Sequence, residues 1–510
     1  MGVMRYFAGS AARNTWAAVV HDTSCSADCP PNRTTRWMRS SDASPFMPRS
    51  RYRSARIAAR TATVPAVRMR ASEIAAAVGG RLVGPDADVD GASFDTRTLR
   101  PGQLFVPIVA ARDGHDFVDD ARRAGAAAVL TARPVAGGGE PAVTSIEVAD
   151  TATALMALAT AGRRRLDATV VGITGSVGKT TTKDLAAAAC TAGRRTTANE
   201  RSFNNEQGLP VTILGAPDDT EVLIVEMGMR GLGHIRTLCD VARPDIGLVT
   251  VVGESHTELL GGIDGVATAK GELIEALPAT GTAVLNADDQ RVLAMAARTD
   301  ATVVTFGTRG DVRVTAVVLD DAGCAAFDLE SPWGSGRVRL PMPGRHLVAN
   351  AAGALAVAGL VGVSLDAAID AVGRADVSAM RMQRIATTSG AVIVNDAYNA
   401  NPTSMRAALD ALASMRAQRK IAVLGAMGEL ADPGPAHLDI AAHADSLELE
   451  LVATGTDAYG RPGLVDVADV VAAVGELGDG DVVLVKASRA AALELVADAL
   501  VSAAGGPAAG

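Results

Sequence analysis

The chain has 510 residues, of which 48% are apolar and 21% are charged, and its formal net charge is −9. At about 150 residues per domain, this length predicts about three domains. The negative charge argues against a general nucleic-acid binder. Five scattered Cys give no disulfide framework, which favours a reducing, cytoplasmic setting. The most apolar helical stretch, AAGALAVAGLVGV at 351–363, is too short to span a bilayer and predicts a buried helix.

Residues 1–68 differ from the rest in composition, because they contain 11 Arg and 3 Asp but neither Lys nor Glu. They are rich in Ser, Thr and Pro and show no periodicity, which is typical of a segment that buries no core. Two interpretations remain open: an Arg-rich targeting leader, or a mis-assigned start with translation beginning at Met69, which we favour. Under both, we expect 1–68 to be disordered and without chemistry. From Met69, MRASEIAAAVGGRLVG predicts a helix that ends at Gly.

The remaining chain predicts an α/β protein of three domains. Residues 69–165 alternate short apolar runs with turns, which indicates a small N-terminal α/β domain. From ATVVGITG (168–175) onward, apolar strands alternate with helical patterns, which predicts a parallel sheet with helices on both faces over 166–376. A further Rossmann-like α/β unit is expected over 377–510.

The stretch GITGSVGKTTTKD (172–184) lies between a predicted strand and a predicted helix. Such a turn directs backbone N–H groups and a helix N-terminus at one point, which suits a phosphate. Lys179 would reach the β- and γ-phosphates, and the hydroxyl of Thr180 or Thr181 would bind Mg²⁺. Ile173 stands where the usual phosphate loop has its first Gly, so a tight turn with a chance Lys is the alternative. The expected nucleotide loop comprises Gly175, Ser176, Val177, Gly178, Lys179, Thr180 and Thr181.

Two further features point to a nucleotide and metal site. Glu226 and His256 each follow an apolar strand, so both are expected at the sheet edge that carries the loop. The chain has only five Lys against 43 Arg. A surviving Lys is favoured where a compact charge or a reactive amine is needed, so we keep Lys179 and Lys270 as functional, with Lys486 as a further candidate.

Seven motifs in order resemble the Mur ligase family of peptidoglycan synthesis: TGSVGKTT, NERSFNNEQGLP, EMGM, GESHTELLGG with ATAKGEL, LNADD, GRHLVAN and VNDAYNANPTSM. The match runs from about residue 69 to 500, and the short G-x-x-G-K-T loop is this family's form. FNNEQGLP and NDAYNANPTSM resemble the branch that joins D-alanyl-D-alanine to UDP-MurNAc-tripeptide. The resemblance implies ATP-dependent ligation through an acyl phosphate, by a cytoplasmic enzyme expected to be a monomer.

The resemblance also implies roles for single residues. Lys179 and Thr180 hold the phosphates and a first Mg²⁺ with Glu226, His256 serves a second Mg²⁺, and Lys270 matches a lysine that family members carbamylate. Asn286 and Asn350 take the adenine positions. Arg381 takes the γ-phosphate position, and Asp396 takes the ribose position. The substrate positions are Asp95, Thr96, Arg97, Arg112, Asp113, Gly114 and His115 for the UDP-sugar, Asn204 and Asn205 for the muramoyl peptide, and Asn395, Tyr398 and Asn399 for the dipeptide. Asn401 is an expected N-cap, with Pro402 at the first helical position.

Some residues depart from the family pattern: Met380, Leu347, Ala426 and Ala487 stand where Gly, Asn, an acidic residue and Gly are usual. Three alternatives therefore stay open. One is a sister Mur-type or folylpolyglutamate-type ligase that adds another amino acid. The others are a P-loop nucleotide switch and a non-catalytic relative.

Overall fold

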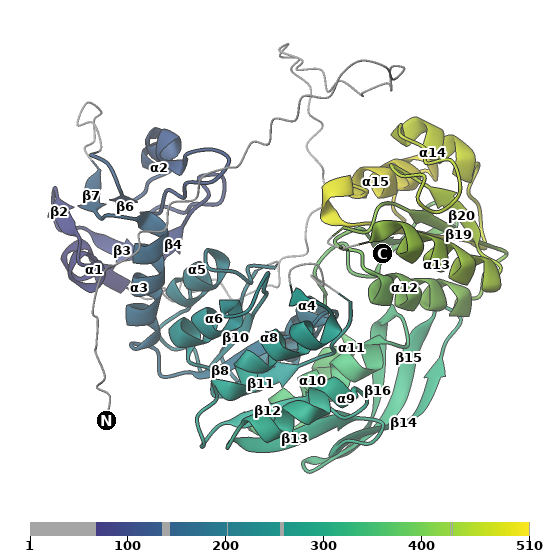
Figure 1. The fold of residues 1–510 in the computed structure, drawn as a ribbon, viewed down its shortest axis with the longest axis horizontal. Helices are drawn as coiled ribbons and strands as arrows, with labels where there is room; N and C mark the ends of the chain where they lie inside the picture. The colour runs from purple at the N-terminus through teal and green to yellow at the C-terminus, as the bar shows by residue number, and fades with distance from the viewer. Residues whose placement is uncertain are drawn as a thin grey trace, which may run out of the picture. The chain divides into compact units, whose positions relative to one another are not determined.

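The structure is a computed structural model that describes residues 68–134, 143–200, 202–254, 260–428, 430 and 432–508 (Figure 1). The described residues all belong to one compact unit. The predicted disorder of the leader concerns residues that, apart from Arg68 in the first strand, lie outside the described part. None of the described helices is both long and apolar enough to cross a membrane.

The first part of the chain carries a five-stranded sheet in the order β2-β7-β6-β5-β4, in which only β2 runs antiparallel to its neighbour. The predicted first helix ends as expected, because Gly79 takes a left-handed φ of 63° at its C-cap. The elements are β1 (Arg68–Arg70), α1 (Ala71–Val78), β2 (Arg81–Val83), β3 (Asp88–Asp90), β4 (Ala92–Ser93), β5 (Leu104–Phe105), η1 (Gly114–Phe117), α2 (Val118–Arg123), β6 (Ala128–Thr131), β7 (Thr144–Glu147) and α3 (Thr151–Arg163).

A nine-stranded sheet follows, in the order β16-β15-β14-β13-β12-β11-β8-β10-β9. The strands from β9 to β14 are parallel, as predicted. Its strands and helices are β8 (Thr169–Thr174), α4 (Lys179–Thr191), β9 (Thr196–Ala198), α5 (Gly208–Leu214), β10 (Val222–Glu226), α6 (His234–Ala242), β11 (Ile246–Val249), α8 (Ile263–Glu275), β12 (Thr282–Asn286), α9 (Gln290–Leu293), η2 (Ala294–Arg298), β13 (Thr302–Gly307), β14 (Val312–Leu319), β15 (Cys324–Ser331), β16 (Gly334–Pro343), α10 (Leu347–Leu360) and α11 (Leu365–Gly373).

The central sheet has a core on each face, because successive strand residues point to opposite sides. In β8, Val170 packs into one cluster, whereas Val171 and Ile173 pack into the other. The apolar helix expected at 351–363 is α10, which is buried along almost its whole length. Its small residues allow close packing beneath the sheet, so the apolar stretch is a core helix, as predicted.

The sequence did not predict the antiparallel extension of this sheet by β15 and β16. Strand β14 alternates buried and exposed residues at its start, and β16 does so through its second half. That pattern is typical of a sheet with one solvated face. The predicted parallel sheet is therefore continued at one edge by two antiparallel strands.

The last part of the chain carries a five-stranded sheet in the order β17-β18-β21-β19-β20, in which only β17 is antiparallel to its neighbour. Parallel strands with helices between them agree with the Rossmann-like expectation (Figure 1). The elements are β17 (Gln383–Ala386), β18 (Val392–Asp396), α12 (Pro402–Ser414), β19 (Arg419–Leu424), α13 (Pro433–Ser446), β20 (Glu450–Ala453), α14 (Val467–Val474), β21 (Asp481–Lys486), η3 (Arg489–Ala491) and α15 (Glu494–Ala503).

Candidate nucleotide and ligase site

The Gly-rich turn joins β8 to α4 in the middle of the central sheet. Gly175 has φ 148° and Gly178, the N-cap of α4, has φ 84°. A Cβ at Gly175 would lie 1.9 Å from Thr250 Oγ1, and one at Gly178 would lie 2.7 Å from Asn350 Oδ1. Both positions therefore require glycine, for conformation and for space.

The loop is held against the segment that follows β11. Ser176 donates from its backbone N–H to Val251 O at 2.8 Å and from its hydroxyl to Gly253 O at 2.9 Å. Thr250 Oγ1 donates to Val177 O at 2.6 Å. The backbone of the loop is thereby fixed, and it leads directly into the N-terminus of a 13-residue helix, a combination that binds anions. Ile173, which replaces the first Gly of the usual loop, lies within β8 and is compatible with this geometry.

Lys179 and Thr180, the first two residues of α4, face the site in different ways. Lys179 Nζ donates to Gly175 O at 2.8 Å, so its ammonium bridges the loop. Thr180 Oγ1 donates to Glu226 Oε2 at 2.8 Å, from the strand that neighbours β8. Thr181 is buried beside them. The predicted proximity of Glu226 to the loop is therefore confirmed.

Two asparagines hold Glu226, one through its carboxylate and one through its backbone. Asn204 Nδ2 donates to Glu226 Oε1 at 2.8 Å, and the Glu226 N–H donates to Asn199 Oδ1 at 2.9 Å. Glu226 itself is only 1% exposed. The bonds from Thr180 and Asn204 fix both carboxylate oxygens beside the N-terminus of α4.

Arg381 brings a cation from the third part of the chain to this cluster. Its Nη2 donates to Thr180 Oγ1 at 2.9 Å and to Ser202 Oγ at 3.2 Å. Its guanidinium carbon lies 4.0 Å from the centroid of the Tyr398 ring, a cation–π contact. Within the described residues its buried Nε has no hydrogen-bond partner. Arg381 thus has unused donor capacity at the end of the helix that carries the phosphate loop.

The backbone around Arg381 is strained. Met380 and Met382, on either side of it, have φ values of 61° and 50°. Such left-handed conformations cost non-glycine residues about 1–2 kcal/mol each. The departure of Met380 from the usual Gly therefore lies at a position whose conformation favours glycine. Met382 is held by a bond from its N–H to Asp396 Oδ1 at 3.0 Å.

Lys270 lies on α8 and is 2% exposed. Burial lowers the pKa of its ammonium well below the usual range, and the positive charge of Lys179 lowers it further. Both effects favour the neutral amine. An amine in that state is a nucleophile, which distinguishes Lys270 from an ordinary structural lysine.

Among the described residues there is no cluster of three or more His, Cys, Asp or Glu that would hold a metal ion. His256, the predicted ligand for a second Mg²⁺, lies outside the described residues. The hydroxyl of Thr180 and the carboxylate of Glu226 are oxygen donors, the kind that Mg²⁺ prefers. A pair of this kind fits an ion that completes its shell with phosphate oxygens and water.

The two predicted adenine residues differ in what their side chains do. Asn286 at the end of β12 donates from Nδ2 to Thr250 O at 2.8 Å and accepts from the Asp288 N–H at 3.0 Å. It thereby holds the segment that supports the loop. Asn350 is buried against Gly178. Near it, burial lowers the pKa of His346 to about 4.

The predicted UDP-sugar residues fall into two loops of the first sheet. Asp95 and Arg97 form an ion pair with Nη2 and Oδ2 2.7 Å apart, and the Arg97 side chain is 86% exposed. Thr96 between them is partly exposed. The ring of Phe94 lies 5.6 Å from that of Phe203, which places this loop beside the segment that carries Asn204.

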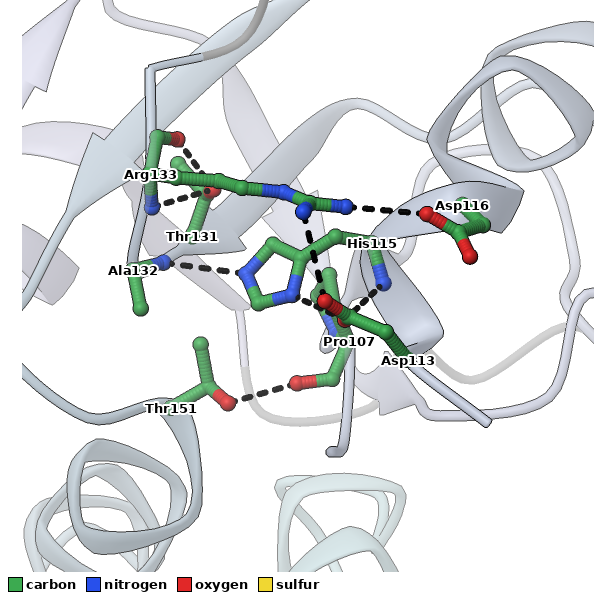
Figure 2. Close-up of polar contacts among 8 residues, drawn as sticks. All are labelled: Pro107, Asp113, His115, Asp116, Thr131, Ala132, Arg133 and Thr151. Carbon is green, nitrogen blue, oxygen red and sulfur yellow. Dashed lines mark hydrogen bonds and ion pairs between the residues drawn. The ribbon is translucent and has the colours of Figure 1, made fainter. Parts of the chain in front are cut away.

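The second loop is built around His115, as Figure 2 shows. Its Nδ1 lies 2.6 Å from Asp113 Oδ1, and its Nε2 accepts from the Ala132 N–H at 3.1 Å. Both ring nitrogens are thus bonded within the chain, and the acceptor role of Nε2 places the proton on Nδ1. A Cβ at Gly114 would lie 2.5 Å from Ile108 N, so this loop also packs tightly. Of the four predicted residues, Arg112 is exposed, whereas the Asp113 carboxylate already contacts His115 and, at 3.3 Å, Arg133.

The motif NDAYNANPTSM forms the turn from β18 into α12. Asn401 caps the helix by accepting the Ser404 N–H at 2.9 Å, with Pro402 first in the helix, as predicted. Asn395 Oδ1 accepts the Ala397 N–H at 3.1 Å, whereas Asn399 Oδ1 accepts that of Ala400 at 2.9 Å. The Asn side chains therefore shape the turn.

The same turn lies against the segment that supports the phosphate loop. A Cβ at Gly253, which the hydroxyl of Ser176 contacts, would lie 2.8 Å from Thr403 Oγ1. The motif therefore packs against the phosphate-loop support, and its Tyr398 contacts Arg381.

Sequence reasoning missed several residues of the site. Ser202 contacts both Thr180 and Arg381, and Asn199 Oδ1 accepts the backbone N–H of Glu226. Both lie in the polar motif NERSFNN, for which the sequence did not predict these contacts. Lys183 was counted among the scarce lysines but given no role; its Nζ donates to Asn199 O at 2.8 Å and pairs with Asp184.

Comparisons with known proteins agree with this arrangement. The family model described as Mur ligase middle domain matches residues 173–358, and that described as Mur ligase, glutamate ligase domain matches 380–503. A protein named UDP-N-acetylmuramoyl-tripeptide–D-alanyl-D-alanine ligase from Mycobacterium tuberculosis (strain CDC 1551 / Oshkosh) is 41% identical, over 80% of this chain and 91% of its own. The protein of the same name from Bacillus subtilis is 35% identical, over 85% and 99%.

Solved structures give the same result. A crystal structure of MurF from Acinetobacter baumannii matches with a TM-score of 0.77 and 28% identity, over 86% of this chain and 100% of that one. MurF ligase from Thermotoga maritima in complex with ADP matches with a TM-score of 0.71 and 27% identity, over 81% and 98%. The fold and site define a three-part α/β protein with a phosphate-binding loop. The chain belongs to the Mur ligase family.

Proposed function

We propose that the chain is an ATP-dependent ligase that joins D-alanyl-D-alanine to UDP-MurNAc-tripeptide and so makes the pentapeptide precursor of peptidoglycan. The observation that carries the proposal is the convergence of Thr180, Glu226 and Arg381 at the N-terminus of α4. The relatives that bear this activity in their names match the chain over most of its length, and an ADP complex in the same fold supports the nucleotide. The proposed setting is the cytoplasm.

The reaction begins with a carboxylate that is a poor electrophile. Its oxygen attacks the γ-phosphorus of ATP, the bond between that phosphorus and the β–γ bridging oxygen breaks, and ADP leaves. The fixed loop amides and Lys179 bind the phosphates, and Arg381 meets the γ-phosphoryl group with its free donor. Positioned cations of this kind stabilise the charge that spreads over the transferring group.

Thr180 and Glu226 would hold Mg²⁺, with His256 proposed for a second ion. The metal would neutralise phosphate charge when bound. The chain's own part is to orient the Glu226 carboxylate through Asn204 and Thr180, while Asn199 holds the Glu226 backbone.

Lys270 is proposed to be carbamylated. Its neutral amine would attack carbon dioxide and lose one proton, and the product is a carbamate with one negative charge. The carbamate is an anion beside the Lys179 ammonium, where a protonated Lys270 would be a second buried cation. Attraction between opposite charges therefore favours the carbamate.

In the second half-reaction the dipeptide amine attacks the acyl carbon. The C–N bond forms, the nitrogen loses a proton, the bond between the acyl carbon and the phosphate oxygen breaks, and phosphate and the proton are released. The amine must arrive unprotonated and aligned, which is a task of positioning. The turn that carries Asn395, Tyr398 and Asn399 is proposed for the dipeptide. The loops with Asp95, Thr96, Arg97, Arg112 and Asp113 are proposed for the UDP-sugar, and Asn204 and Asn205 for the peptide.

Phosphate release from ATP, measured with each acceptor alone and with both, tests the proposal. We expect release that depends on both UDP-MurNAc-tripeptide and D-alanyl-D-alanine. Release with another amino acid in place of the dipeptide would reassign the chain to a sister ligase. ATP binding without release in the presence of both would leave a switch or an inactive relative.

A further inference from the structure

We infer that Lys486 is a positioning residue that ties the arginine proposed for the γ-phosphate to the turn proposed for the dipeptide. The inference rests on the proposed function and goes beyond it, because that function gives Lys486 no role. Lys486 is the last residue of β21, and parallel register places it beside Asp396, the last residue of β18. It is 2% exposed.

The ammonium of Lys486 contacts two segments at once. It donates to Asp396 Oδ2 at 2.6 Å and to the Asn399 carbonyl at 2.8 Å. The other carboxylate oxygen, Asp396 Oδ1, accepts the Met382 N–H at 3.0 Å. Through one carboxylate, Lys486 therefore reaches the backbone next to Arg381.

A second path returns to the same lysine. The guanidinium of Arg381 lies over the Tyr398 ring, and Tyr398 precedes Asn399, whose carbonyl Lys486 binds. The contacts form a closed ring: Lys486, Asp396, Met382, Arg381, Tyr398 and Asn399. A shift at one member of such a ring moves the others, so the ring couples the arginine to the turn.

The loop after β21 supports the same turn. Ser488 Oγ, two residues beyond Lys486, donates to the Ala400 carbonyl at 3.3 Å and accepts the Gly428 N–H at 2.6 Å. The end of β21 therefore holds the carbonyls of two consecutive residues of the turn.

Stability alone does not account for a buried ion pair here. Desolvation of two charges offsets most of their attraction, and apolar replacements of buried pairs are often neutral or stabilising. In the middle of the sheet, between β18 and β19, apolar residues fill most other positions of β21. The ammonium supplies what an apolar residue does not: two directed bonds to two segments that both face the site.

The test compares steady-state kinetics of the full chain with Lys486→Met, and with Lys420→Met as the matched control. Lys420 lies on the neighbouring strand β19, and its ammonium donates to the Ala413 carbonyl, away from the ring. Each substrate is varied in turn, and the thermal midpoint of each variant is recorded. Lys486→Gln, which keeps a donor, serves if the Met variant does not fold.

We expect Lys486→Met to lose about 100-fold in kcat/KM for D-alanyl-D-alanine, since small misplacements of positioning groups cost this much. The KM for UDP-MurNAc-tripeptide should stay within about twofold of wild type, and Lys420→Met should match wild type. A folded Lys486 variant with unchanged dipeptide kinetics, or with a KM for UDP-MurNAc-tripeptide that rises as much as the KM for the dipeptide, would overturn the inference. Failure of the wild-type chain to release phosphate would instead reject the proposed function.

Discussion

The guanidinium of Arg381 donates to the hydroxyl of Thr180 at 2.9 Å, although Thr180 lies in α4 beside the nine-stranded sheet and Arg381 precedes β17 of the last sheet. Thr180 also donates to Glu226, so one hydroxyl joins the helix that follows the phosphate loop, a strand-end carboxylate and a cation from the third part of the chain. This contact places the proposed chemistry at the N-terminus of α4. It also makes that chemistry depend on residues about 200 positions apart.

Arg381→Lys should lower kcat by about 1,000-fold, because arginines that stabilise a transferring phosphoryl group contribute about that much or more. A lysine keeps the charge but loses the planar fork that contacts two hydroxyls and Tyr398. Arg384→Lys, at an exposed position of the next strand, is the control and should behave as wild type. A kcat for Arg381→Lys within tenfold of wild type would exclude Arg381 from phosphoryl transfer.

Gly175→Ala should abolish ATP binding, measured by calorimetry with Mg²⁺ present. The added methyl would meet Thr250 Oγ1 at 1.9 Å, at a φ of 148° that non-glycine residues avoid. Gly434→Ala is the control, since a Cβ there meets only Asp432 at 3.9 Å within the helix α13. Normal ATP affinity in Gly175→Ala would mean that the loop is not the phosphate site.

Lys270→Ala should lose almost all ligase activity while ATP binding persists. Wild-type enzyme freed of carbon dioxide should lose activity and regain it with added bicarbonate, because the buried neutral amine is ready to form a carbamate. A carbon-13 NMR signal from labelled bicarbonate, present in wild type and absent in Lys270→Ala, reports the modification. Near-normal turnover in Lys270→Ala would remove this lysine from the mechanism.

His346 should make folding sensitive to acid. Burial lowers its pKa to about 4 from a usual 6.5, and the charge of Lys486 also lowers it, against opposing effects of Asp396 and Asp410. Between pH 6.5 and pH 4, His346 is protonated in the unfolded chain but not in the native state. The free energy of unfolding therefore falls as the pH drops through this range. Relative to His346→Gln, wild type should lose about 2 kcal/mol between pH 7 and pH 5 in denaturant titrations. If the free energy of unfolding changed equally with pH in wild type and His346→Gln, the lowered pKa of His346 would be contradicted.

His115→Phe should raise the KM for UDP-MurNAc-tripeptide and leave kcat nearly unchanged. The ring orients the Asp113 carboxylate and the Ala132 backbone, as Figure 2 shows, and a phenyl ring makes neither bond. Substrate binding that is equal in ground and transition states changes KM alone. His443→Phe, at a surface ion pair with Asp410, is the control. A fall in kcat with an unchanged KM would contradict a role of this loop in substrate binding.

The parts of the fold that the sequence predicted have local signals. Apolar strands such as β8 and β10, glycines at 175 and 178, and Asn401 before Pro402 each follow from short-range pattern and conformation. The strand-end position of Glu226 followed from the rule that parallel strands share a carboxyl edge.

The parts that were missed depend on long-range register or on weak local pattern. The pairing of Lys486 with Asp396 joins residues 90 positions apart and exists only because β18 and β21 are neighbours. Strands β15 and β16 lie where an uninterrupted series of strands and helices was expected. Ser202 contacts Thr180 and Arg381, which belong to two other segments of the chain. A local sequence pattern does not predict such contacts.

The most direct measurement of the central claim follows an oxygen atom. UDP-MurNAc-tripeptide labelled with oxygen-18 in its terminal carboxylate is turned over with ATP and D-alanyl-D-alanine, and the released phosphate is analysed by mass spectrometry. Transfer of the γ-phosphoryl group to that carboxylate predicts one oxygen-18 atom in each phosphate, together with ADP. Unlabelled phosphate alongside pentapeptide, or AMP as the nucleotide product, would contradict the acyl-phosphate account.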